Sequence, residues 1–216
     1  MPNSGIESRR QAAIEEGGTA YIARRQEILR TAAHIFREKG YEATLRDVAE
    51  ALSTDRASIY YYFGSKEEVL QEIVREALAH DMAAARAIQR SNDSTPDKIR
   101  ALIYSMVVGF AEFYPHMNVH VEDLGRIARQ DSAWAVEIIE ETRQYEALVR
   151  AILRQGQEEG ALRGDISINV AAMSLFGMIN WMYRWYRPTY PVAPEEIAAS
   201  FAELFLAGIV PPASAA

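Results

Sequence analysis

The sequence of 216 residues contains no cysteine, which excludes disulfide bonds, thiolate nucleophiles and cysteine-ligated zinc sites. It also lacks an apolar run long enough for a membrane span, because its most apolar window, residues 168–183, is shorter than the roughly 20 residues that such a helix needs. Residues 1–18 are polar and lack the apolar core of a secretory signal. These absences predict a cytoplasmic protein with no membrane partner.

Positive charge is scarce as well, since 23 Lys and Arg residues stand against 30 Asp and Glu residues, for a formal net charge of −7. An acidic chain is an unpromising partner for nucleic acid, because phosphate binding depends on Lys and Arg side chains. Only the charge of the contacting face matters, however, and a small basic region can sit on an acidic protein. The positions of the cations must therefore decide this question.

Strict alternation of apolar and polar residues is missing, whereas apolar residues recur at helical spacing from residue 21 onward. This pattern predicts an all-α fold with nine helices and no internal repeat. The expected helices lie at about 21–39, 44–52, 55–63, 65–90, 96–114, 116–129, 132–159, 168–187 and 194–209. The predicted organisation is a flexible arm at 1–20, a helix-turn-helix domain at 21–80 and a ligand-binding and dimerisation domain at 81–210.

Two short helices within residues 44–63, joined by a polar turn and preceded by a longer helix, are the ingredients of a helix-turn-helix unit. Thr44 is suited to cap the first short helix, and either Thr54 or Asp55 is suited to cap the second. Ser65 with Glu68 forms a capping box that opens the following long helix.

The segment 44–70, TLRDVAEALSTDRASIYYYFGSKEEVL, closely resembles the DNA-binding signature of TetR-family regulators. The resemblance extends over about 24–78, and the layout of nine helices is also similar to that of the family. One departure is Ser53-Thr54, where the family usually has a glycine and an apolar residue, so the backbone angle of this turn is open. The resemblance implies a ligand-relieved repressor that binds a palindromic double-stranded DNA operator as a homodimer, with no enzymatic activity and no cofactor.

The chemistry of the segment fits this resemblance. Thr44 lies at a helix N-terminus, where the family implies a phosphate contact. Arg56 can reach guanine edges, and the hydroxyls and rings of Tyr60 and Tyr61 are expected on the exposed side of the recognition helix. The candidate DNA-binding residues are Thr44, Arg46, Thr54, Asp55, Arg56, Ala57, Ser58, Tyr60, Tyr61 and Lys66.

The helix at 168–187 is apolar nearly all round and must be covered on more than one side. A homodimer provides this cover, and in the TetR family the last two helices form a four-helix interface. Replacement of Phe176 and Phe205 by glutamate is expected to disrupt this interface.

An effector site is expected in the body, where residues 96–129 carry an aromatic and methionine set suited to an apolar ligand. The segment 180–188, NWMYRWYRP, resembles TetR-type regulators of lipid and sterol catabolism that bind acyl-coenzyme A, with Arg184 and Arg187 available for phosphates. A structural Arg–Trp stack explains the same string. The candidate ligand-binding residues are Phe110, Phe113, Tyr114, Met117, Met178, Trp181, Arg184, Trp185 and Arg187.

Two alternatives stay open at this point. The chain can instead be the repressor of an efflux system that senses lipophilic drugs. The more remote alternative is a small helical metal-dependent enzyme, because one helical face carries His116, His120 and Asp123, which can bind a divalent metal. A solvent-exposed helix face is the commoner explanation of such a pattern.

Overall fold

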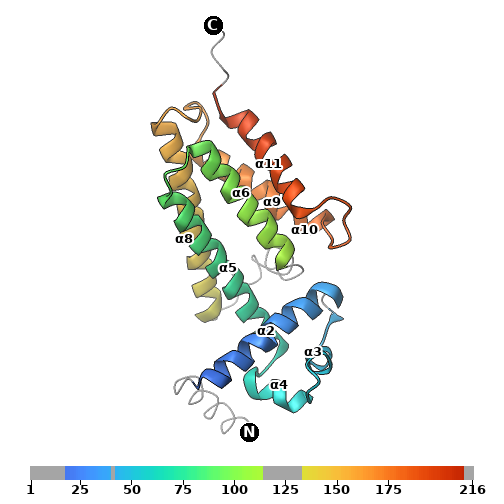
Figure 1. Cartoon of the computed structure of the whole chain (residues 1–216). Coiled ribbons are helices and arrows are strands. Elements are labelled where there is room, and N and C mark those ends of the chain that lie inside the picture. Colours follow the sequence, from blue (N-terminus) through green and yellow to red (C-terminus); the bar gives the residue numbers. More distant parts are fainter. Residues whose placement is uncertain (1–17, 40–41, 114–132, 212–216) are drawn as a thin grey trace. The chain divides into compact units, whose positions relative to one another are not determined.

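The structure, a computed structural model, describes residues 18–39, 42–113 and 133–211, and these residues form helices and their connections (Figure 1). The helices are α2 (Thr19–Lys39), α3 (Leu45–Ala51), α4 (Arg56–Tyr62), α5 (Lys66–Arg90), α6 (Thr95–Glu112), α8 (Ala133–Glu158), α9 (Ile168–Asn180), α10 (Met182–Trp185) and α11 (Pro194–Ile209). The helix expected at about 116–129 lies outside the described residues. No helix in the described ranges is long and apolar enough to cross a membrane.

The chain divides into two compact units, and the division falls within α5 between Arg75 and Glu76. The first unit contains α2, α3, α4, the start of α5 and Phe113. The second unit contains the rest of α5 together with α6 and the helices from α8 onward.

The two short helices of the first unit, α3 and α4, are capped at their N-termini by side chains. The N-cap of α3 is Thr44, and the N-cap of α4 is Asp55, whose carboxylate accepts a hydrogen bond from the Ser58 amide at 2.6 Å. A single apolar cluster from all four helices holds them together, and α3 and α4 depend on it because helices of seven residues are too short to be stable alone. Its fully buried large side chains include Ile28, Leu29, Phe36, Val48, Ile59 and Phe63.

The turn between α3 and α4 places Ser53 at a positive φ of 50°. This is the left-handed region that favours glycine, and serine adopts it here at some cost in stability. The Ser53 and Thr54 amides donate to the carbonyls of Glu50 and Ala49, at 3.1 and 3.0 Å. The turn therefore keeps its tight backbone conformation although it has a serine at this position.

In the second unit, α6 packs along α11, and α8 packs against both α6 and α9 (Figure 1). Gly156 of α8 packs closely against its surroundings, since an added Cβ would lie 2.7 Å from Leu162 Cδ1 and still closer to the side chain of Thr95. Only glycine fits at this position without movement of its neighbours.

Two expectations about the last helices are wrong. The continuous helix expected at 168–187 is broken at Trp181 into α9 and α10, where the Arg184 amide donates to the Trp181 carbonyl three residues back, and Tyr186 is already extended ahead of Pro188. Phe205 is buried within its own chain, with 8% of its surface exposed, and Phe176 is half-buried. The exposed apolar residue of this part of α11 is Leu204, the residue just before Phe205.

Candidate nucleic-acid interface

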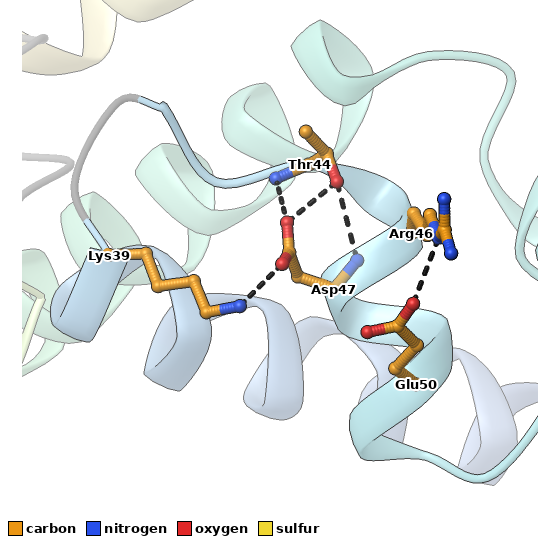
Figure 2. Close-up of polar contacts among 5 residues, drawn as sticks. All are labelled: Lys39, Thr44, Arg46, Asp47 and Glu50. Atoms are coloured by element: carbon orange, nitrogen blue, oxygen red, sulfur yellow. Dashed lines mark hydrogen bonds and ion pairs between the residues drawn. The ribbon is translucent and has the colours of Figure 1, made fainter.

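A polar network fixes the start of α3, and Figure 2 shows its members. The Thr44 hydroxyl donates to Asp47 Oδ2 at 2.6 Å and accepts from the Asp47 amide, while the Thr44 amide donates to the same carboxylate oxygen at 2.7 Å. The Lys39 ammonium pairs with the other oxygen of Asp47. Lys39 first, and then the hydrogen bonds from Thr44, hold the pKa of Asp47 well below its usual range. Asp47 thus stays ionised and keeps Thr44 in one orientation.

The sequence pattern singled out Thr44 but missed Lys39. Lys39 is the last residue of α2, and its contact with Asp47 depends on how α2 and α3 pack. The only local signal is a lysine in the final turn of a helix, which is too common to identify a partner. Its pKa is raised chiefly by Asp47, in agreement with the pairing.

The recognition helix α4 is anchored from one side and open on the other. Ile59 and the capping residue Phe63 are fully buried in the core of the first unit. Tyr61 is 43% exposed, with its ring 5.0 Å from that of Tyr62. Ala57 is exposed as well, and Ser58 is half-buried. The outer side of α4 therefore presents a small residue, a hydroxyl and an aromatic ring together.

Arg56 and Tyr60 interact with each other on this helix. The Arg56 guanidinium donates to the Tyr60 hydroxyl at 2.8 Å and lies 5.0 Å from the centre of its ring. Tyr60 is half-buried against the core cluster, so it is less open than expected. A guanidinium held by one aromatic side chain still has donors free for a base edge.

The remaining candidates of the first unit occupy different settings. Arg46 is exposed and its Nε donates to Glu50 at 2.9 Å, which leaves its terminal nitrogens outside that contact (Figure 2). Lys66 lies with its ammonium 5.5 Å from the ring of Phe36. Thr54 is half-buried in the turn, and Asp55 is engaged as the cap of α4. All ten candidate DNA-binding residues thus fall in the same unit.

Arg25 of α2 is a structural residue that also lies in this unit. Its guanidinium pairs with Glu72 at 3.2 Å and lies 4.6 Å from the ring of Phe63. It joins α2 to α5 over the end of the recognition helix.

The candidate ligand-binding residues are brought together only in part. Trp185 lies 5.2 Å from Tyr190 and 6.4 Å from Phe201, and the buried ring of Phe110 lies 6.2 Å from Tyr186. Phe113, in contrast, packs against the core of the first unit. Met178 is half-buried on α9. Tyr114 and Met117 lie outside the described residues, as do His116, His120 and Asp123.

The two arginines near the end of α10 are exposed but have contacts within the chain. The Arg184 guanidinium lies 5.7 Å from the ring of Trp181, which is itself exposed. Arg187 donates to the carbonyl of Tyr186 at 2.7 Å. The Arg–Trp contact considered as the alternative to a phosphate site is therefore present.

Two family models match the chain. Residues 28–73 match the model described as bacterial regulatory proteins, tetR family, and residues 92–209 match the model of a tetracyclin repressor-like C-terminal domain. The HTH-type transcriptional repressor KstR2 of Mycobacterium tuberculosis is 27% identical over 188 residues, which cover 87% of this chain and 93% of KstR2.

Solved structures agree with this likeness. The ketosteroid transcriptional regulator KstR2 of M. tuberculosis superposes with a TM-score of 0.74 at 26% identity, over 88% of this chain and 96% of that one. PfmR from Thermus thermophilus has a TM-score of 0.71 at 33% identity, over 83% and 97% of the two chains. AibR, solved in complex with isovaleryl coenzyme A and operator DNA, shares the fold with a TM-score of 0.65 at 20% identity, over 84% and 97%.

Proposed function

The chain belongs to the TetR family of bacterial regulatory proteins, and from this premise we propose that it is a dimeric repressor that releases a palindromic operator when an effector binds its body. Family membership makes the chain a transcriptional regulator rather than an enzyme, so the metal-dependent enzyme suggested by the histidine pattern is set aside. The all-α, TetR-like fold expected from the sequence is confirmed.

The observation that carries the DNA-binding proposal is the anchoring of α4. Ile59 and Phe63 are buried behind the helix while Arg56 and Tyr61 remain at its outer side. A helix held in this way can enter a major groove without losing its contacts to the core. Asp47 holds Thr44 and thereby fixes the start of α3, and in this proposal a backbone phosphate lies at that helix N-terminus.

Operator binding tests this assignment. Arg56→Ala and Tyr61→Ala should each weaken binding to a palindromic site, selected from a random duplex library, by about 1–3 kcal/mol. Lys66→Ala should weaken specific and non-specific binding alike and flatten the salt dependence. Arg143→Ala, which removes an exposed cation of α8, is the charge-matched control and should bind as wild type.

The assignment fails if Arg56→Ala and Tyr61→Ala both bind the selected operator with wild-type affinity while keeping wild-type thermal stability. A loss of binding in the Arg143→Ala control would point to net charge in place of a local contact.

A dimer through α9 and α11 is supported by the apolar residues that these helices leave exposed. Val170, Met173 and Trp181 follow one face of α9 and its end at spacings of three and eight residues, and Leu204 of α11 is 70% exposed. Exposed apolar side chains on neighbouring helices mark an interaction surface. Two-fold symmetry of the protein would match the symmetry of a palindromic operator.

Substitution of Met173 and Leu204 by glutamate should yield monomers with much weaker operator binding, as seen by sedimentation velocity. Val136→Glu is the control, because Val136 is an exposed apolar residue of α8, a helix that carries none of these residues. A double variant that sediments as wild type would reject the interface.

An acyl-coenzyme A is the effector that we propose. Arg184 and Arg187 are exposed, and Arg184 lies against Trp181, so their guanidinium groups can receive phosphates while an acyl chain enters the body. AibR, which shares the fold, was solved with isovaleryl coenzyme A.

Titration of isovaleryl and palmitoyl coenzyme A against the protein–operator complex tests this proposal, with palmitate and free coenzyme A as controls. A thioester should release the operator, and Arg184→Ala with Arg187→Ala should raise the required concentration about tenfold or more, equivalent to about 1.4 kcal/mol. Release by a free acid or a lipophilic drug, and by no thioester, would instead favour the efflux regulator.

A further inference from the structure

A largely buried carboxyl group lies inside the second unit where three helices approach one another. It belongs to Asp81 of α5, whose side chain is 19% exposed. On α6, a Cβ added to Gly109 would lie 3.3 Å from Asp81 Oδ1. On α8, Tyr145 is buried, and the negative charge of Asp81 adds to the effect of burial in raising the pKa of its phenol.

This carboxyl has little to compensate for its burial. Its ion-pair contact is to His80, whose Nδ1 lies 3.8 Å from Oδ1 and whose side chain is mostly in solvent. Among the described residues, no Lys or Arg lies within ion-pair distance of Asp81. Burial raises its pKa to about 6. A buried carboxyl that served stability would be paired or hydrogen-bonded, so Asp81 is better explained by a role in binding.

Gly109 is a second feature near Asp81 that lowers the stability of the folded chain. Glycine in the interior of a helix is less stable than alanine, and Gly109 lies within α6 among buried neighbours. An alanine here would crowd the carboxyl oxygen at 3.3 Å. The glycine therefore lets α6 pack close to Asp81 Oδ1, and the 19% of the Asp81 side chain that stays accessible is the part that a ligand can reach.

Apolar side chains are buried on the same helices that carry Asp81, Gly109 and Tyr145. The Tyr145 ring lies 6.1 Å from Phe176, and Met82 and Met106 are buried on the two helices that carry Asp81 and Gly109. A carboxylate only accepts hydrogen bonds, and it repels another anion. The group that it would receive is therefore a donor attached to an apolar skeleton.

We propose that Asp81, with Tyr145 beside it, is a polar anchor for an effector in the body, and that it accepts a hydrogen bond from a hydroxyl or ammonium group of an otherwise apolar ligand. The inference rests on the proposed function only in that the second unit receives an effector. It adds that the site prefers ligands whose apolar skeleton ends in a hydrogen-bond donor.

Calorimetric titration of the full chain without DNA tests the anchor with four probes that share one alkyl chain: decanol, decylamine, decyl methyl ether and decanoate. Decanol and decylamine should bind about tenfold or more tightly than the ether, which has no donor, and than the anionic decanoate. Asp81→Ala should abolish this preference, and Gly109→Ala should weaken binding of both donors. Glu140→Gln, which removes an exposed carboxylate of α8, should leave the preference unchanged.

The Asp81→Asn variant separates the two sources of the donor, because an amide oxygen still accepts from a hydroxyl but does not pair with an ammonium charge. Thermal melts show which variants are folded. If Asp81→Ala does not fold, the binding of the probes to Asp81→Asn and Gly109→Ala tests the anchor instead. Equal binding of donor and ether, a preference that survives loss of the carboxylate, or no binding of any probe would overturn the anchor. Such a failure with operator binding intact would leave the repressor proposal standing.

Discussion

Replacing Asp81 by asparagine should stabilise the folded chain at neutral pH while changing little in acid. Burial raises the pKa of the carboxyl from 3.8 to about 6, and His80 opposes this only in part. Each pKa unit corresponds to about 1.4 kcal/mol, so a shift of about two units amounts to about 3 kcal/mol in the free energy of unfolding. The figure is an upper value, because the side chain keeps 19% exposure and the asparagine amide must itself find partners.

The sign follows from which state holds the proton. Below about pH 4 the carboxyl is protonated in the folded and the unfolded chain, and it carries no penalty. Between about pH 4 and pH 6 the unfolded chain releases its proton first, so the free energy of unfolding falls as the pH rises. Above about pH 6 both states are ionised and the penalty is complete. Asparagine does not titrate, so its advantage should appear across this interval.

Urea denaturation of both proteins from pH 4 to pH 8 at one protein concentration measures this difference, since a constant concentration keeps any contribution of association fixed. The two stability curves should meet near the acid end and separate by up to about 3 kcal/mol at neutral pH. Parallel curves, or a variant that is less stable at every pH, would show that the carboxylate is well satisfied in the folded chain, and the reasoning about Asp81 would be wrong.

Three further outcomes are expected. Ser53→Gly should raise the free energy of unfolding by about 0.5–1 kcal/mol in urea, because it relieves a positive φ; no gain would mean that the turn is unstrained. Gly156→Ala should lower the same quantity by about 1–3 kcal/mol, because the added Cβ would overlap Thr95, whereas Gly164→Ala has open space and should change little; equal effects would contradict the close packing. Asp47→Ala should weaken operator binding several-fold in fluorescence anisotropy with the helical content unchanged, and wild-type affinity would show that the start of α3 needs no such network.

The sequence by itself determined the features that depend on neighbouring residues. Helical spacing of apolar residues, the caps at Thr44 and Ser65, and the polar turn at Ser53 are local, because a helix and its ends are defined by contacts within a few residues. The choice between Thr54 and Asp55 as the cap of α4 was still open at that level. It depends on backbone angles, and the structure assigns it to Asp55.

Only the tertiary structure decided what depends on residues far apart in the chain. Phe205 and Leu204 are adjacent and both apolar, and only the packing of α11 on α6 buries the first and exposes the second. Asp81 looked like one more charge on a long helix. Gly109 and Tyr145 lie far along the chain from it, and bringing them beside it removes water from the carboxyl. Burial of this kind has no local signature, because it is produced by whichever distant helices close over a residue.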